Sequence, residues 1–393
     1  MTLDGAFDAR TELAKRAVAM LPLLDEHQGY SDTHSELAPE VVEAFHRDGM
    51  FQMWVPERLG GSELGPIDSL EVIEISSYGD PSAGWVQMAT CLSTGTAAAY
   101  LGPDAVADLF AHGGYPVIAG QGTRPGTART VDGGYLLSGE WSFASGLKHG
   151  THIHTLAVVQ ETGEPRIFVL PVDQATLHPD SWDVLGLRGT GSIDYTITDS
   201  FVPEEFTHFA FSRDGSRGDI YRLGVLAFAS VCHSGWAMGV GRRLLDELSD
   251  LVRTKKGRPG SLIETDAFRT NLAKAEARFR SATAFVREAW TDVEASVDDG
   301  QEITVRQDTL IRIALGNITD ALADVANFVY LSGGTTALRK GSPIERLVRD
   351  VHAGTQHITS GPGMWRAAGE ELAGAAGNKQ WVLLDLVDVS APS

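Results

Sequence analysis

Cysteine is scarce in this sequence, which has only two in 393 residues, Cys91 and Cys232. The two lie far apart among apolar or small residues, with no CxxC pair and no Cys or His at metal-ligand spacing. A disulfide framework, a metal site and a catalytic cysteine are therefore not expected. Both side chains are predicted to lie in the core of a protein from a reducing compartment.

Basic residues are also few, with 32 Lys and Arg against 52 Asp and Glu, a net charge of −20 and a pI of about 4.9. Such a chain lacks the clustered cations that bind nucleic acid or anionic lipid. No apolar run approaches the roughly 18 residues of a membrane span, and the N-terminal segment MTLDGAFDAR lacks the pattern of a signal peptide. We expect a cytoplasmic protein with a small-molecule partner.

What the chain does contain is ample core material, 43% hydrophobic residues, in three regions of different periodicity. Apolar residues recur at helical spacing up to about residue 115, and β-branched runs separated by turn residues fill 116–215. Longer helical patterns follow over 216–393, with apolar stripes at 268–293 and 310–329. This predicts an α+β chain: a helical domain, an antiparallel, barrel-like β-domain and a C-terminal four-helix bundle.

Four segments stand out within these regions, one of them a strand-like run that ends abruptly in a hydroxyl, glycine and ionisable groups. With the order of the regions they resemble the acyl-CoA dehydrogenase fold superfamily across almost the whole chain. The segments are IAGQGTRPGTA (118–128), LSGEWSFASG (137–146), WDVLGLRGTGSIDYTITDSFVP (182–203) and LSGGTTALRKGSPIERLVRD (331–350).

The resemblance implies a flavin, with Phe143 against the isoalloxazine, Ser145 donating a hydrogen bond at or near N5, and Gly146 allowing backbone to approach the ring. The residue types agree, because an aromatic two positions before a hydroxyl on a strand shares its face. The alternative is a barrel strand with a core aromatic and a turn serine. The remaining cofactor-binding residues implied are Trp141, Gln121, Gly122, Thr123, Arg188, Thr190, Ser192, Gly333 and Gly334.

Nucleotide motifs are incomplete. GVGRRL (239–244) has only the first part of a dinucleotide fingerprint and follows no strand, and GLRGTGS (186–192) lacks the P-loop lysine. We therefore expect hydride for the flavin to come from a separate NAD(P)H-dependent flavin reductase.

The catalytic base separates the possible reactions. Common acyl-CoA dehydrogenases carry a glutamate shortly after a late Arg-Asp, but no carboxylate occurs between Asp350 and Glu370, and His357 stands eight residues after Arg349. This pattern resembles the oxygenase components of two-component flavin-dependent monooxygenases of the aromatic hydroxylase type (group D).

That resemblance implies oxygenation of a small aromatic or polycyclic substrate by reduced flavin (FMNH2 or FADH2) and O2 through a C4a-hydroperoxyflavin. Ser145 would hold the N5 proton, and His357, with a pKa near neutrality, would act as base. His357 could instead be a hydrogen-bonded core histidine. His352, five residues earlier on what should be the same helix, cannot share its face and is the weaker candidate.

Other residues are expected to line the substrate pocket: Trp85, Met88, Ser93, His149 and His352. For the first three, a packed helix core is an equally good interpretation. Many such hydroxylases carry a histidine about eight residues after a tryptophan, where this chain has Ser93. The departure leaves room for N- or S-oxygenation.

Two other functions stay open: an acyl-CoA dehydrogenase with an unusual base, and a flavin-binding module without efficient turnover. The fold's relatives pair such bundles, and the two apolar stripes exceed what one small bundle needs. A homotetramer is therefore predicted.

Overall fold

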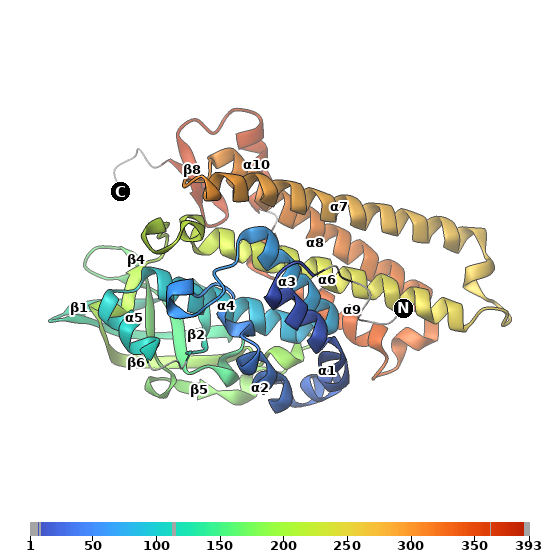
Figure 1. Ribbon diagram of the computed structural model, residues 1–393, viewed down its shortest axis with the longest axis horizontal. Coiled ribbons are helices and arrows are strands. Elements are labelled where there is room, and N and C mark those ends of the chain that lie inside the picture. The colour runs from blue at the N-terminus through green and yellow to red at the C-terminus, as the bar shows by residue number, and fades with distance from the viewer. Residues whose placement is uncertain (1–6, 8, 112–114, 362, 389–393) are drawn as a thin grey trace.

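The structure is a computed structural model that describes residues 7, 9–111, 115–361 and 363–388. Most of the N-terminal segment inspected above for an export signal lies outside these residues. Figure 1 shows the N-terminal helices and a β-sheet at one end of the molecule and three long helices extending away from them.

The N-terminal part is helical, as predicted. Thr11 caps its first helix by accepting the Ala14 N–H, and Asp80 caps another by accepting the Ser82 N–H at 2.8 Å. Cys91 and Cys232 are buried and free, as predicted. The helices are α1 (Glu12–His34), α2 (Pro39–Arg47), α3 (Pro66–Gly79), α4 (Pro81–Tyr100) and α5 (Pro103–Leu109).

A seven-stranded sheet follows, in the order β5-β6-β2-β1-β3-β4-β7. Its pairs are antiparallel except β1 with β3, which run parallel. Strand pairing leaves β5 and β7 as edges, so the sheet is mostly antiparallel and open, and the predicted barrel is not confirmed. The strands are β1 (Ile118–Val131), β2 (Gly134–Ala144), β3 (His152–Val159), β4 (Pro165–Pro171), β5 (Thr176–His178), β6 (Ile193–Pro203) and β7 (Thr207–Phe209).

Long helices α6, α7 and α8 pack side by side (Figure 1). Most residues of both predicted apolar stripes are buried within this one chain, from Phe268 to Val293 and from Ile311 to Val329. The stripes therefore give no surplus for an oligomer interface, contrary to our expectation. The C-terminal helices are α6 (Gly224–Thr254), α7 (Asp266–Asp298), α8 (Val305–Gly333), α9 (Pro343–Gly354) and α10 (Gly363–Leu372).

Helix α6 runs through the centre of the molecule. Within the described residues, the stretch Asp219–Thr254 is long and apolar enough to cross a membrane, yet 78% of its most apolar window is buried inside the protein. A core helix has this composition. One continuous core joins α6 to the N-terminal helices, and the sheet has a core of its own.

A C-terminal hairpin, β8 (Lys379–Val382) with β9 (Asp385–Asp388), was not predicted. It packs on α8, where Trp381 Nε1 donates to Thr309 Oγ1 at 2.8 Å. The apolar run WVLLDLV was the available signal, but two short strands are hard to distinguish from a loop.

Candidate active site

Ser145 lies immediately after β2 and begins a chain of hydroxyl groups. Trp85 Nε1 donates to Ser145 Oγ (3.0 Å), which lies 2.9 Å from Ser192 Oγ; Ser192 Oγ lies 2.7 Å from Thr190 Oγ1. Thr190 Oγ1 donates to the Leu187 carbonyl at 2.8 Å. Because each hydroxyl has one proton, Ser192 must donate to Thr190 and Ser145 to Ser192. Ser145 Oγ therefore keeps one lone pair for a ligand that donates.

Phe143 presents an exposed aromatic ring near this serine. Its side chain is 67% exposed and meets Trp182 edge-on at 6.1 Å. Phe143 has a φ of 68°, and the β2–β6 register shifts between Trp141 and Ala144. The alternation expected of a regular strand therefore does not hold here, and a bulge sets the direction of the ring.

Gly146 has a structural use in addition to the one predicted. Its φ is 79°, and a Cβ there would lie 2.9 Å from Thr90 Cγ2. The glycine lets the turn after β2 approach α4, which brings Ser145 within reach of Trp85.

Trp85, on α4, is the centre of an aromatic group that we call the Trp85 cluster. Its ring meets His233 at 5.0 Å, Trp236 at 5.1 Å and His357 at 5.8 Å, each edge-on. The rings of His233 and His357 lie 4.1 Å apart and tilted by 32°. The cluster brings together three segments far apart in sequence, and Trp85 links it to Ser145.

His357 follows the end of α9 and precedes a 3₁₀ turn, Ile358–Ser360. The expectation that it shares a helix with His352 is wrong, because α9 ends at Gly354. Thr359 fixes the ring, with its Oγ1 2.9 Å from His357 Nδ1. Nε2 is then the ring nitrogen available to a ligand.

Gly354 explains why α9 ends against the cluster. A Cβ at this position would lie 2.2 Å from Trp236 Cη2, and the Trp236 N–H is held by the Pro81 carbonyl at 3.0 Å. A larger residue would displace either the indole or the helix end that leads to His357.

Burial keeps both histidines neutral. It lowers the pKa of His357 to about 4, and it lowers the pKa of His233 well below its usual value, to which the nearby His357 adds. The near-neutral pKa expected for His357 is thus corrected: the ring is uncharged at pH 7.

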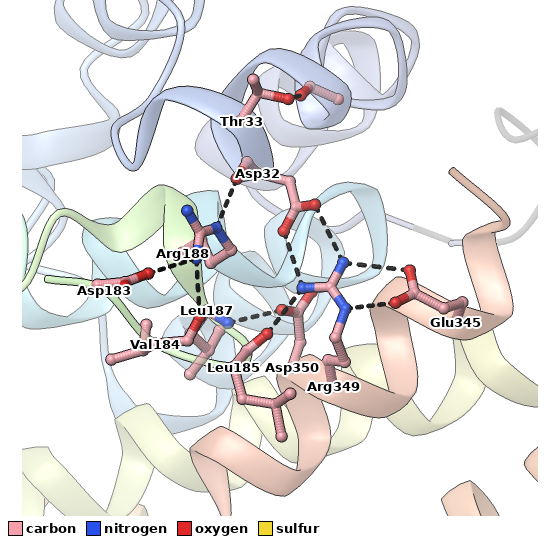
Figure 2. Close-up of polar contacts among 11 residues, drawn as sticks. Asp32, Thr33, Asp183, Val184, Leu185, Leu187, Arg188, Glu345, Arg349 and Asp350 are labelled. Carbon is pink, nitrogen blue, oxygen red and sulfur yellow. Dashed lines mark hydrogen bonds and ion pairs between the residues drawn. The ribbon is translucent and has the colours of Figure 1, made fainter. Parts of the chain in front are cut away.

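Ion pairs join α1, α9 and the loop before β6 (Figure 2). The Arg349 guanidinium binds both carboxylate oxygens of Asp32 at 3.0 Å, pairs with Glu345 at 2.7 Å, and donates to the Leu185 carbonyl at 2.8 Å. Such bidentate pairing fixes orientation as well as distance.

Asp350 extends this junction to the hydroxyl chain. Its carboxylate accepts the Leu187 N–H at 2.6 Å, and Leu187 in turn accepts from Thr190. Full burial raises the pKa of Asp350 to about 7. The helix that leads to His357 therefore also positions the loop behind Ser145.

A cavity of about 230 Å³ lies beside the cluster. Its lining includes Thr359, adjacent to His357, and Ser230, one turn before His233 on α6. The full lining is Thr123, Leu226, Ser230, Arg312, Ile358, Thr359, Leu383 and Leu384.

Two of the expected cofactor-binding residues, Trp141 and Arg188, make their described contacts within the protein. Trp141 is 1% exposed, stacks on Tyr195 at 5.3 Å and donates to the Leu156 carbonyl. Arg188 donates to the backbone carbonyls of Asp32 and Val184 (Figure 2). Thr190 and Ser192 are likewise buried, in the hydroxyl chain behind Ser145.

Residues Gln121, Gly122 and Thr123 form an irregular part of β1, where its register with β3 shifts. Thr123 lines the cavity, and the Gln121 amide donates to the Thr123 hydroxyl. Gly333 and Gly334 do not join them: Gly333 ends α8, 21 residues beyond the cavity residue Arg312, or about 30 Å at helical rise.

The expected pocket residues divide similarly. Trp85 belongs to the cluster, but Met88 and Ser93 are buried on α4 and are not among the residues lining the cavity. His149 Nε2 accepts the Leu37 N–H at 3.2 Å, joining the β-domain to the N-terminal helices. His352 is exposed on α9 and is not among the residues lining the cavity.

His233 is the functional candidate that the sequence analysis missed. It lies in the apolar run VLAFASVCHSGWAMGV on α6, and a lone histidine there is 8% exposed. That contrast in polarity was the available signal, but only the fold shows that its partner is His357.

Comparison with known proteins agrees with this arrangement. The family model described as "Acyl-CoA dehydrogenase, N-terminal domain" matches residues 11–108, and "Acyl-CoA dehydrogenase, C-terminal domain" matches residues 231–361. Among solved structures, 3-HSA hydroxylase from Rhodococcus sp. RHA1 aligns with a TM-score of 0.87 at 22% identity, covering 93% of this chain and 97% of that chain. That likeness shows the fold.

Curated relatives are more specific. Indole-3-acetate monooxygenase from Pseudomonas putida is 31% identical over 359 residues, covering 88% of this chain and 90% of the relative. The oxygenase subunit HsaA of a flavin-dependent monooxygenase from Rhodococcus jostii is 24% identical, covering 88% and 94%. The oxygenase component of FADH2-dependent resorcinol hydroxylase from Rhizobium sp. is 25% identical, covering 84% and 85%. This chain therefore belongs to the flavin-dependent monooxygenases built on the acyl-CoA dehydrogenase fold.

Proposed function

We propose that the protein is the oxygenase component of a two-component monooxygenase that acts on a small aromatic substrate. Reduced flavin comes from a separate NAD(P)H-dependent reductase; one atom of O2 enters the substrate and the other leaves as water. The observation that carries the proposal is the convergence of Ser145, the Trp85 cluster and His357. Relatives named as oxygenase subunits or components support it.

The residues present fit a flavin. Phe143 offers an exposed aromatic face of the kind a flat ring covers, and Ser145 has one lone pair unfilled. Reduced flavin, when bound, supplies the two electrons that activate O2. Phe143 and Ser145 would hold it, with the irregular segment Gln121–Thr123 as a further wall.

Ser145 would then have a definite task, which is to accept a hydrogen bond from the flavin N5–H. Its own proton is engaged by Ser192 and its other lone pair by Trp85. The count of hydroxyl protons therefore favours Ser145 as a hydrogen-bond acceptor at N5, whereas the sequence analysis expected it to be a donor. A rigid acceptor keeps the N5 proton from reaching solvent.

His357 is the proposed base. In the tautomer whose Nδ1–H donates to Thr359 Oγ1, the neutral ring presents an unprotonated Nε2, which can take a proton from the substrate. His233 covers its other face. His233, Trp85 and Trp236 are themselves buried and shield this side of His357 from water; dry surroundings suppress H2O2 release.

The alternatives receive less support. In the contacts described, Ser145, Trp85, His233 and His357 meet rings, hydroxyls and backbone, and none meets a carboxylate. The base of an acyl-CoA dehydrogenase therefore has no counterpart in this cluster. N- or S-oxygenation would use the same residues and differs only in the substrate.

Assembly as a cytoplasmic homotetramer is part of the proposal, with folding units 1–115, 116–215 and 216–393. Exposed apolar side chains gather at the remote end of α8 and just after it: Leu331 is 79% exposed and Leu338 64% exposed. A second copy covering them would also bring Gly333 and Gly334 to a neighbour's flavin. Light scattering at micromolar concentration should give four chains; a monomer would contradict this.

The decisive experiment supplies reduced FMN or FAD and ¹⁸O2 with aromatic substrates. We expect one ¹⁸O atom in the product and tighter binding of reduced than of oxidised flavin, so that the purified protein is nearly colourless. Copurification of oxidised FAD that an acyl-CoA reduces would overturn the proposal.

A further inference from the structure

Arg312 occupies an unusual position, because a guanidinium with about 6% of its side chain exposed lines the cavity beside His357. It lies on α8 and shares the cavity lining with Leu226 and Ser230 of α6 and with Leu383 of the C-terminal hairpin. The rest of the lining is aliphatic or hydroxyl-bearing. A buried cation in such surroundings needs full pairing.

That pairing is incomplete. Arg312 Nη1 donates to the Leu383 carbonyl at 2.8 Å, Nε lies 3.3 Å from Asp308 Oδ1, and the guanidinium stacks 4.5 Å above Trp381. These contacts fix the plane of the head group. Nη2, however, is buried without a hydrogen-bond partner among the described residues.

The charges around Arg312 are also unbalanced, with an excess of positive charge. Asp308 pairs with Arg312 and also with Arg213, whose Nη2 lies 2.8 Å from Asp308 Oδ2. Two guanidinium groups share one carboxylate, which leaves one net positive charge in a largely buried group. A second carboxylate brought to the guanidinium from the cavity would balance it through a charge-assisted hydrogen bond.

The cavity limits what could carry that carboxylate. Its volume of about 230 Å³ falls below the roughly 300–1,000 Å³ of most ligand clefts. Aliphatic walls suit a small ring, and Thr359 at one side borders His357. A molecule with its acid group at Arg312 would therefore extend its ring toward the base.

We propose that Arg312 binds the carboxylate of the substrate, which makes the substrate a small aromatic acid. This rests on the proposed function for the identity of the site, but the recognition itself needs no turnover. The relative named indole-3-acetate monooxygenase acts on a molecule of this class, which makes that acid a suitable probe.

The test is equilibrium binding without oxygen, on the full-length protein loaded with reduced flavin. Three acids are compared with their amides: indole-3-acetate, phenylacetate and benzoate against indole-3-acetamide, phenylacetamide and benzamide. At least one acid should bind tenfold or more tighter than its amide. Arg312→Gln should weaken binding of that acid by roughly ten- to a hundredfold. It should change binding of the amide by less than about threefold.

Arg366→Gln is the matched control, because Arg366 is 62% exposed and pairs with Asp385 of the same hairpin. It removes an equal charge nearby and should leave the acid-to-amide ratio unchanged. If Arg312→Gln does not fold, Arg312→Lys is the variant to test. It keeps the positive charge but loses the paired N–H donors of the guanidinium. In Arg312→Lys the ratio of acid affinity to amide affinity should fall but stay above one.

Equal binding of every acid and its amide by the native protein would overturn the inference, as would an undiminished ratio in Arg312→Gln or Arg312→Lys. Acid-selective binding without ¹⁸O incorporation would instead refute the proposed function and leave Arg312 as an acid-binding residue.

Discussion

At the scale of single residues, the site depends on where protons lie. Ser145 Oγ accepts from Trp85 and donates to Ser192, so its remaining lone pair is directed by two fixed neighbours. Neither direction could be predicted from the sequence, because Trp85 and Ser192 lie 60 and 47 positions from Ser145.

Ser145→Ala should let the protein bind reduced flavin but release more H2O2 for each product formed. A neutral hydrogen bond of about 0.5–1.5 kcal/mol corresponds to a roughly two- to tenfold change in that ratio. The ratio is measured by peroxide assay and product chromatography. Ser138→Ala, on the same strand away from the cluster, serves as control; equal ratios in both variants would refute the role of Ser145.

His357→Ala should leave flavin binding intact and reduce product formation by roughly 10²–10⁴-fold. Because burial lowers the pKa of His357 to about 4, the acid limb of the native pH profile should lie near that value and vanish in the variant. Thr359→Val, which frees the ring, should reduce the rate less and keep the limb. Wild-type turnover in His357→Ala would show that another group is the base.

At the scale of elements, α9 positions both sides of the site. Asp350 holds the loop behind Ser145, and the end of the helix at Gly354 leads to His357. Asp350→Ala should cost about 1–3 kcal/mol of stability, because it leaves the Leu187 N–H buried and unpaired. It should also raise H2O2 release.

Asp350→Asn is the informative partner of that variant, since its amide oxygen can still accept from Leu187. Urea denaturation should place the stability of Asp350→Asn near that of wild type and the stability of Asp350→Ala well below it. The peroxide assay should find increased H2O2 release only in Asp350→Ala. If the two substitutions behave alike, the hydrogen bond to Leu187 is not what positions the loop.

Helices and strands were predictable where periodicity is strong, as in α7, α8 and β6, and the four segments correctly indicated the family. What failed depended on tertiary contacts. Trp141 and Phe143 are both aromatic residues of β2, yet one is buried and the other exposed, because a bulge breaks the alternation. His233 was missed because its partner is 124 positions away in sequence.

At the scale of the whole molecule, seven histidines have lowered pKa values, all chiefly because of desolvation: His46, His149, His152, His154, His208, His233 and His357. The unfolded chain therefore binds more protons than the folded one between about pH 4 and the ordinary value of 6.5. Their contribution to stability is present above pH 6.5 and is lost as the pH falls toward 4.

Buried carboxyls act in the opposite direction, and burial raises the pKa of three of them, Glu74, Asp80 and Asp350. Burial raises the pKa of Glu74 and of Asp350 to about 7, so their contribution is present at low pH and is lost as the pH rises through 7. The seven histidines outnumber these three carboxyls, and the urea midpoint should fall steadily from pH 6.5 to 4.5. His154→Gln should flatten that fall; a native midpoint that stays constant over this range would contradict the balance.

The C-terminal hairpin separates some of the residues that line the cavity from the proposed catalytic residues along the chain. Residues 379–388 supply Leu383 and Leu384 to the cavity and a carbonyl to Arg312, whereas Ser145, Trp85 and His357 all precede it. Evolution, or a protein engineer, could exchange this ten-residue cassette between homologues and so alter which acids are accepted while the oxygen chemistry is inherited unchanged.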